Sequence, residues 1–218
     1  MNPGIEQKIK RIIKHEAKSI LSIPITDEFE KAIEIIYERV HKKGGMLVAS
    51  GMGKAGQIAL NISTTFSSTG TPSVFLDPCA AQHGDLGIIR PNDVLLIVSN
   101  SGKTTEIIQL LHLVKRLYPD TKIPLIVISG NPNSILASQA DAFLFTGAPR
   151  EVCPLGLTPT TSTTTMTVIG DILVSLMIEK IGFTPEDYAK RHHAGYLGKK
   201  SRALQKYLNS NDNNLKSN

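Results

Sequence analysis

Short apolar runs alternate with longer amphipathic stretches along most of this chain. The apolar runs follow Gly44-Gly45, are rich in β-branched residues and are not interrupted by regularly spaced polar residues. Such runs are typical of strands covered on both faces, as in parallel sheets. The runs are Met46–Ala49, Ser73–Leu76, Val94–Val98, Leu125–Ile128 and Ala142–Phe145. They predict a five-stranded parallel sheet.

Amphipathic stretches of helical length separate the predicted strands. They are Lys54–Ser68, Thr104–Leu117 and Asn133–Gln139, and Ser162–Ile181 follows the last strand. Helices that alternate with parallel strands cover both faces of the sheet. The pattern therefore predicts an α/β fold, a three-layer α/β/α sandwich of the flavodoxin-like or Rossmann-like kind.

Two further amphipathic patterns open the chain, at Ile5–Leu21 and Phe29–His41, with Pro24 and the capping signal Thr26-Asp27-Glu28 between them. We expect both to form a packing layer on the domain. The polar stretch Asn209–Asn218 predicts a disordered tail. The expected organisation is one domain over residues 1–208 that includes the two packing helices.

Composition and charge narrow the function. The 218 residues are 41% hydrophobic and 20% charged, which suits one globular core. No apolar run approaches the roughly 20 residues of a membrane helix, so we expect no membrane association. Two cysteines, Cys79 and Cys153, predict free thiols and a cytoplasmic protein. The net charge is +5, but the basic residues are dispersed and only 5% of residues are aromatic, which favours an anionic small substrate over nucleic acid.

Two glycine-containing segments resemble nucleotide-binding motifs, but neither fits its motif fully. Gly51-Met52-Gly53-Lys54-Ala55-Gly56 is a G-x-G-x-x-G pattern after the first strand, and Asp77 ends the next strand, as in a dinucleotide site. Lys54 argues against that interpretation, because a charged side chain there suits a polar cleft better than the underside of a cofactor. Gly102-Lys103-Thr104 ends like a P-loop, but Ile97 stands where that motif requires its first glycine.

The turn Ser99-Asn100-Ser101-Gly102-Lys103-Thr104 is a better candidate for binding phosphate. It follows the strand Val94–Val98 and opens a helix, so hydroxyl groups and unpaired helix N–H groups come together there. Ligands of such sheets bind beyond the carboxyl ends of the strands. The alternative is plain helix capping by Ser101 with Glu106, which leaves the extra serine and threonines unexplained.

Beyond these turns, six segments occur in a recognisable order. They are Gly51-Met52-Gly53-Lys54-Ala55-Gly56, Ser67-Ser68-Thr69-Gly70-Thr71-Pro72, His83-Gly84-Asp85-Leu86-Gly87, Ser99-Asn100-Ser101-Gly102, Glu151-Val152-Cys153-Pro154-Leu155-Gly156-Leu157-Thr158-Pro159-Thr160 and His192-His193-Ala194-Gly195-Tyr196-Leu197-Gly198. Together they resemble the arabinose 5-phosphate isomerases, a branch of the sugar isomerase (SIS) domain family. The resemblance covers nearly all of residues 45–200.

The resemblance implies an SIS domain that interconverts D-ribulose 5-phosphate and D-arabinose 5-phosphate through an enediolate. The product would supply 3-deoxy-D-manno-octulosonic acid (Kdo) for lipopolysaccharide or capsule. No cofactor is expected, and the family assembles as a homotetramer with active sites at subunit interfaces. The matching catalytic residues are Lys54, Glu106, Glu151 and His192. We expect contacts with the substrate or its phosphate at Ser50, Gly51, Gly53, His83, Ser99, Asn100, Ser101 and Thr104.

The expected chemistry distributes roles among the four catalytic candidates. A base must move a proton between two carbons, and a cation must offset the enediolate oxygen. Glu151, in a stiff proline-rich loop, is the favoured base, while Glu106 is either the base or a capping carboxylate. Lys54 is assigned to the enediolate or the sugar oxygens. His192 is assigned a proton shuttle, acting either within its own chain or from a neighbouring subunit.

The sequence also departs from the family pattern. The usual member carries two nucleotide-sensing CBS modules after the SIS domain, whereas this chain ends soon after His192, so we expect no regulation through them. Lys103 and His193 replace residues expected to be non-basic. Feedback is then expected at the active site, from CMP-Kdo, which carries both a phosphate and a sugar acid.

Other ligands and functions remain as alternatives. The spacing of the cysteine, histidine and aspartate residues fits no zinc signature, so we expect no dedicated metal site, only inhibitory zinc at His83 and His192. A non-catalytic SIS regulator that binds a sugar phosphate is the main alternative function. A dehydrogenase is the third.

Overall fold

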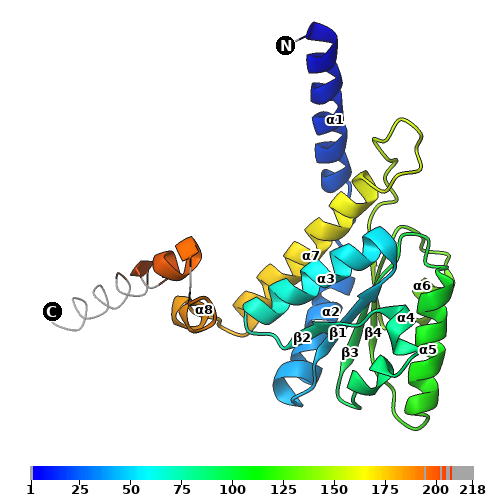
Figure 1. Cartoon of the computed structure of the whole chain (residues 1–218), viewed down its shortest axis with the longest axis vertical. Coiled ribbons are helices and arrows are strands. Elements are labelled where there is room, and N and C mark those ends of the chain that lie inside the picture. The colour runs from blue at the N-terminus through cyan, green and yellow to red at the C-terminus, as the bar shows by residue number, and fades with distance from the viewer. Residues whose placement is uncertain (1, 194, 202, 205–206, 208–218) are drawn as a thin grey trace.

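Five strands form one parallel sheet in the order β2-β1-β3-β4-β5 (Figure 1). The computed structural model describes residues 2–193, 195–201, 203–204 and 207, so the predicted tail at 209–218 lies outside the described residues. The strands are β1 (Leu47–Gly51), β2 (Ser73–Phe75), β3 (Val94–Val98), β4 (Leu125–Ser129) and β5 (Ala142–Phe145). The predicted sheet is confirmed. Its strand order is the flavodoxin-like one, in which ligands bind at the carboxyl ends of the strands.

Helices cover both faces of this sheet. One face carries α2 (Glu28–Ile36), α3 (Gly53–Ser68) and α7 (Thr161–Lys180). The other carries α4 (Pro78–Ala81), α5 (Thr105–Leu117) and α6 (Ile135–Gln139), with the short 3₁₀ helix η2 (Asp85–Ile88) between α4 and β3. The three-layer α/β/α architecture is therefore confirmed. The pattern did not predict α4 and η2, because four-residue helices are too short to show a period.

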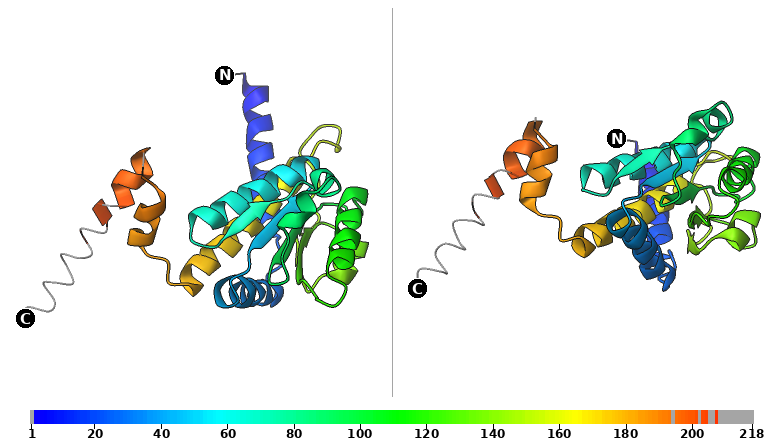
Figure 2. Two further views of the ribbon diagram at one scale, coloured as in Figure 1. Left: turned by 60° about the horizontal axis from the view of Figure 1, so that its bottom comes forward. Right: turned by 90° about the horizontal axis from the view of Figure 1, so that it is seen from below.

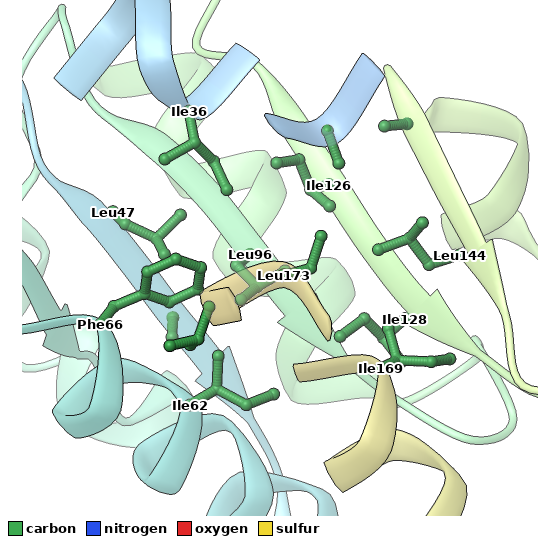
Figure 3. Packing of buried hydrophobic residues seen from close by; sticks show 14 of the residues in the cluster. Ile36, Leu47, Ile62, Phe66, Leu96, Ile126, Ile128, Leu144, Ile169 and Leu173 are labelled. Carbon is green, nitrogen blue, oxygen red and sulfur yellow. The ribbon is translucent and has the colours of Figure 1, made fainter. Parts of the chain in front are cut away.

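The larger part of the core lies between the sheet and α2, α3 and α7. Ile36, Phe66 and Leu173 from these helices converge on the strands and are fully buried (Figure 3). Each such side chain stabilises the fold by about 1.5–3 kcal/mol. Gly170 lets α7 approach α3 closely, because a Cβ at this position would lie 2.4 Å from Cγ1 of Ile62.

α7 is long and apolar enough to cross a membrane by length and composition, which the hydrophobic pattern did not predict. Half of the stretch Thr161–Lys180 is buried inside the domain. Met166, Ile169 and Leu173 belong to the core on the helix-covered face. Packing in the core therefore accounts for the apolar character of α7.

The first helix does not pack as the sequence suggested. α2, continued by a π-helical turn η1 (Tyr37–Lys42), buries Phe29 and Ile33 against the sheet layer. α1 (Pro3–Leu21) instead projects from the domain (Figures 1 and 2), and none of its residues is buried. Ile5 and Ile13 are 53% and 63% exposed. α2 thus lies where the expected packing layer would be, whereas α1 meets the domain only toward its carboxyl end, where Ile20 packs against the core, and Ile5 and Ile13 remain exposed.

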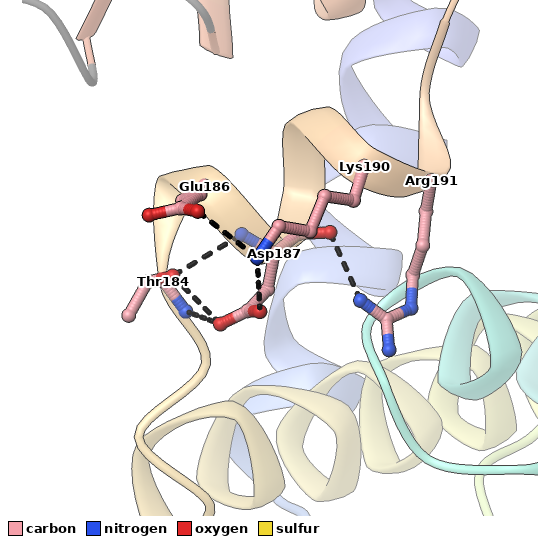
Figure 4. Close-up of polar contacts among 5 residues, drawn as sticks. All are labelled: Thr184, Glu186, Asp187, Lys190 and Arg191. Atoms are coloured by element: carbon pink, nitrogen blue, oxygen red, sulfur yellow. Dashed lines mark hydrogen bonds and ion pairs between the residues drawn. The ribbon is translucent and has the colours of Figure 1, made fainter.

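The chain leaves the domain again after α7 and forms α8 (Pro185–Arg191) away from the sheet (Figure 2). Thr184 and Asp187 form a reciprocal capping box at its start, and Glu186 pairs with Lys190 along its surface (Figure 4). Residues 195–201 are helical as well. These local interactions explain why so short and polar a helix forms outside the core.

Candidate active site

The turn at 99–104 leaves the carboxyl end of β3 and leads directly into α5. The hydroxyls of Ser99 and Thr104 lie 2.9 Å apart, and Ser99 is 2% exposed. Thr104 is the N-cap residue of α5 but makes no side-chain capping bond, so the first N–H groups of the helix are available to an anion. Ser101 accepts a hydrogen bond from Lys103 N rather than from the helix. The structure therefore does not support the alternative that Ser101 caps α5.

The loop after β4 holds this turn in place. The Asn131 side chain donates to the Ser101 carbonyl (3.0 Å), and the Ser129 hydroxyl donates to the Asn100 carbonyl (3.2 Å). Gly102 has a φ of +61°, and a Cβ there would lie 2.1 Å from Ser134 Oγ. Asn131, Ser129 and Ser134 were missed by sequence reasoning. Their position at the carboxyl end of a parallel strand was the available signal.

The glycine turn after β1 lies at the same edge of the sheet. Gly51 pairs with Val98 in β3, and a Cβ on Gly51 would lie 2.8 Å from the Val98 carbonyl oxygen. Ser50 is fully buried and its Oγ has no partner in the described part of the chain. Lys54 is exposed in the first turn of α3, with Nζ 3.5 Å from Gln57 Oε1. Gly53, with a φ of +59°, makes the turn that presents it.

Asp77, the acidic residue of the apparent dinucleotide pattern, caps a helix. Its carboxylate accepts hydrogen bonds from Cys79 N (2.8 Å) and Ala80 N (3.1 Å) and so caps α4. His83 is exposed in the turn after α4, which begins beyond the carboxyl end of β2. The acidic residue of the apparent dinucleotide pattern is thus used within the chain, while His83 remains at the site edge.

The two candidate carboxylates differ in their partners. Glu106 is half-buried in the first turn of α5, and its side chain makes no hydrogen bond or ion pair with the described residues. Glu151 Oε2 accepts from Thr160 N (2.7 Å), Thr160 Oγ1 (2.8 Å) and Ser162 N (3.3 Å) at the start of α7. Partial burial acts to raise the pKa of Glu151, but the hydrogen bonds from Ser162 and Thr160 outweigh it and lower the pKa below 4.5. Glu151 is therefore an ionised carboxylate that its hydrogen bonds to Thr160 and Ser162 hold in place.

Cys153 follows two residues later in the same loop. The Thr158 hydroxyl and the backbone N–H groups of Thr158, Leu155 and Leu157 surround its sulfur and lower the pKa of the thiol to about 6. The side chain is partly exposed, and Cys79 is likewise a free thiol. The loop that carries Glu151 thus favours negative charge at a second position.

His192 lies at the other end of the domain. Its ring stacks on Tyr188, with 3.8 Å between centroids, and its Nδ1 lies 3.0 Å from the Tyr188 carbonyl. Tyr188 lines a groove with Thr69 and Ile178, at the carboxyl ends of α3 and α7. Lys54 and Glu151 lie at the amino ends of the same helices, and a 16-residue helix such as α3 spans about 24 Å. One chain therefore does not bring His192 to Lys54, Glu106 and Glu151.

The same separation applies to the two histidines considered for zinc. His83 lies near the carboxyl edge of the sheet, and His192 follows α8 at the opposite end of the domain. Among residues 2–193 and the other described positions, no three metal-binding side chains cluster. A zinc ion shared by His83 and His192 would need two chains.

Comparisons with known proteins agree with this geometry. The SIS domain family matches residues 41–176. An arabinose 5-phosphate isomerase, KdsD, from Yersinia pestis is 43% identical over 204 residues, which are 92% of this chain and 60% of that protein. The chain thus spans less than two thirds of the length of that relative.

Two solved structures match over nearly their whole length. A Bacteroides fragilis protein, assigned as a phosphosugar isomerase involved in capsule formation, is 59% identical with a TM-score of 0.86, covering 88% of this chain and 99% of that one. An Escherichia coli protein in complex with arabinose 5-phosphate is 32% identical with a TM-score of 0.79, covering 88% and 99%. The chain belongs to the SIS domain family.

Proposed function

We propose that this chain interconverts D-ribulose 5-phosphate and D-arabinose 5-phosphate. The name of the Yersinia pestis relative and the ligand of the Escherichia coli structure support this substrate. Lys54, Glu106 and Glu151 stand at the positions that the isomerase resemblance assigns to catalysis. We also propose that the reaction takes place in the cytoplasm, in keeping with two free thiols, and supplies Kdo for lipopolysaccharide or capsule.

The turn at 99–104 is the observation that carries the proposal. Its hydroxyl groups and the unpaired N–H groups of α5 form an anion site at the carboxyl edge of the sheet. Asn100 and Ser101 are exposed there, while Ser99 and Thr104 lie deeper. A sugar phosphate held by its phosphate in this turn extends its carbonyl end toward the neighbouring glycine turn and Lys54.

Glu151 is the proposed base. Three donors hold Oε2, so Oε1 can take the proton from C1 of the ketose or C2 of the aldose and return it to the other carbon. Its lowered pKa keeps it ionised at neutral pH, but the same hydrogen bonds make it a weaker base, so its position must contribute more to proton transfer than its basicity does. The Lys54 ammonium offsets the charge on the enediolate oxygen. Glu106, at the start of α5 beside the phosphate turn, orients the sugar hydroxyls.

We propose that His192 enters the site from a second copy of the chain, within the homotetramer that the isomerase resemblance implies. The exposed apolar stripe of α1 and the arm that carries α8 both extend from the domain as subunit contacts would (Figure 2). Co-expressed Lys54→Met and His192→Asn variants, each inactive alone, should restore activity at about a quarter of the sites, since random pairing gives that fraction. No recovery in mixed oligomers would place both residues in one chain and contradict the shared site.

A substrate panel tests the reaction itself. The purified chain, with arabinose, ribose and glucose phosphates as competitors, should isomerise ribulose 5-phosphate with exchange of one carbon-bound proton for deuterium from solvent. Binding of arabinose 5-phosphate without turnover would instead identify a non-catalytic regulator. Turnover of another sugar phosphate alone would refute the proposed substrate.

A further inference from the structure

The carboxyl-terminal half of α1 contacts residues 147–152, the segment that carries Glu151. His15 Nε2–H donates to the Arg150 carbonyl at 2.7 Å. A Cβ on Gly147 would lie 3.0 Å from the Ser22 carbonyl oxygen, so the two backbones approach closely where α1 ends. α1 therefore touches the segment at its start and directly before Glu151.

A third contact passes through a buried hydroxyl. Thr161, which is 0% exposed, donates its hydroxyl to Glu16 Oε1 at 2.8 Å. The same Oγ1 accepts from Val152 N at 3.1 Å. A hydroxyl has one hydrogen to donate, so an acceptor at Glu16 directs that hydrogen away and leaves a lone pair for the Val152 N–H. Glu16 thereby orients the bond that fixes the residue after Glu151.

The backbone of this segment needs such support. Ala148 has a φ of +49°, a conformation that costs an L-residue about 1–2 kcal/mol and persists where the surroundings enforce it. Glu16 Oε2 is buried and finds no hydrogen-bond partner among the described residues. Burying a carboxylate oxygen without a hydrogen-bond partner lowers the stability of the fold. The contact of Glu16 with Thr161 gives this carboxylate a role in the loop that offsets the cost.

We propose that Glu16 is a positioning residue of the active site, acting through Thr161 and Val152 to hold the Glu151 carboxylate in place. This inference rests on the proposed function of Glu151. Glu16 does not touch the substrate. It links α1, whose exposed stripe faces outward, to the loop that carries the base.

Two substitutions at one position separate positioning from general stability. Glu16→Ala removes the acceptor for the Thr161 hydroxyl and should lower kcat by about 10- to 100-fold, the size expected for a misplaced catalytic group, with KM changed less than about 3-fold. Glu16→Gln keeps an acceptor oxygen and should restore kcat to within about 3-fold of wild type. Thr161→Val, which removes the bridging hydroxyl at similar volume, should reproduce the loss. Glu6→Gln, on the same helix and paired only with Lys10, is the matched control and should change neither constant.

Hydrogen exchange supplies a readout that does not depend on turnover. Deuterium uptake in a peptide covering residues 150–158 should be about tenfold faster in Glu16→Ala and Thr161→Val, and unchanged in Glu6→Gln. Wild-type kcat and wild-type exchange in Glu16→Ala would overturn the proposal, as would equal losses in Glu16→Ala and Glu16→Gln. A wild-type chain without isomerase activity would refute the proposed function and the catalytic part of this inference, whereas unchanged exchange would refute the coupling itself.

Discussion

Gly102 shapes the backbone of the phosphate turn, and Gly102→Ala tests how far the turn depends on it. Gly102 is buried and has a φ of +61°. An added Cβ would lie 2.1 Å from Ser134 Oγ and 2.4 Å from Ser134 Cβ, both well inside contact distance. The substitution therefore imposes backbone strain and pushes on the residue that caps α6.

The expected destabilisation has two parts. The left-handed conformation costs an alanine about 1–2 kcal/mol. Ser134 Oγ accepts from Ala137 N at 3.2 Å, and displacing that cap costs about 1 kcal/mol more. Gly102→Ala should thus lose about 2–3 kcal/mol. Gly44→Ala is the matched control, because Gly44 has a φ of +67° with no atom within 4 Å of an added Cβ, and it should lose only about 1–2 kcal/mol.

Denaturant unfolding and steady-state kinetics measure the two effects. Gly102→Ala should raise KM for the sugar phosphate at least about tenfold, because the turn no longer fits the phosphate, while Gly44→Ala should leave KM unchanged. Adding Ser134→Gly removes both clashing atoms and should recover part of KM, whereas adding Ser134→Ala keeps the Cβ at 2.4 Å and should not. A Gly102→Ala chain with wild-type KM and stability would refute the reasoning.

Four further predictions concern Glu151, Cys153 and feedback. Glu151→Gln should lower kcat at least about 100-fold with little change in KM, and wild-type turnover would exclude Glu151 as the base. Because the pKa of Glu151 is lowered in the folded state, its ionised carboxylate stabilises the fold fully above pH 4.5, and this stabilisation is lost as the pH falls through the lower folded-state pKa. In Glu151→Gln the free energy of unfolding should therefore change less with pH over that acidic range, as denaturant unfolding at each pH would measure. Iodoacetamide should alkylate Cys153 with a midpoint near pH 6, which Thr158→Val should raise; a midpoint near 9 in wild type would contradict the thiolate. CMP-Kdo should inhibit competitively with the sugar phosphate, and noncompetitive or absent inhibition would count against feedback at this site.

The sheet could be predicted because its signal is local. Val94–Val98 and Leu125–Ser129 are buried at every position, so their runs show no polar alternation and identify interior strands directly. The phosphate turn could be predicted for a related reason, since the carboxyl ends of parallel strands share one edge. These features need only the order of residues along one stretch of chain.

The partners of the site residues could not be predicted in this way. The bond from Thr161 to Glu16 joins residues 145 positions apart, and no periodicity in α1 distinguishes Glu16 from a solvated glutamate. Nothing in the sequence pairs Thr160 with Glu151, yet Thr160 holds the Glu151 carboxylate and helps to lower its pKa. Such roles depend on tertiary contacts between side chains that are ordinary in sequence.

The separation of His192 from Lys54 follows from the helices between them. α3 and α7 run from the carboxyl edge of the sheet toward its amino edge, so a residue that follows α7 emerges far from the residues that precede α3 and α7. The arm with α8 continues outward, and its ring contact with Tyr188 holds His192 on that arm. α1 extends from the opposite end of the domain, and its apolar residues Ile5 and Ile13 are exposed. If His192 takes part in catalysis, the protein must associate, because only a second copy can carry that residue to the edge where the phosphate turn, Lys54 and Glu151 meet.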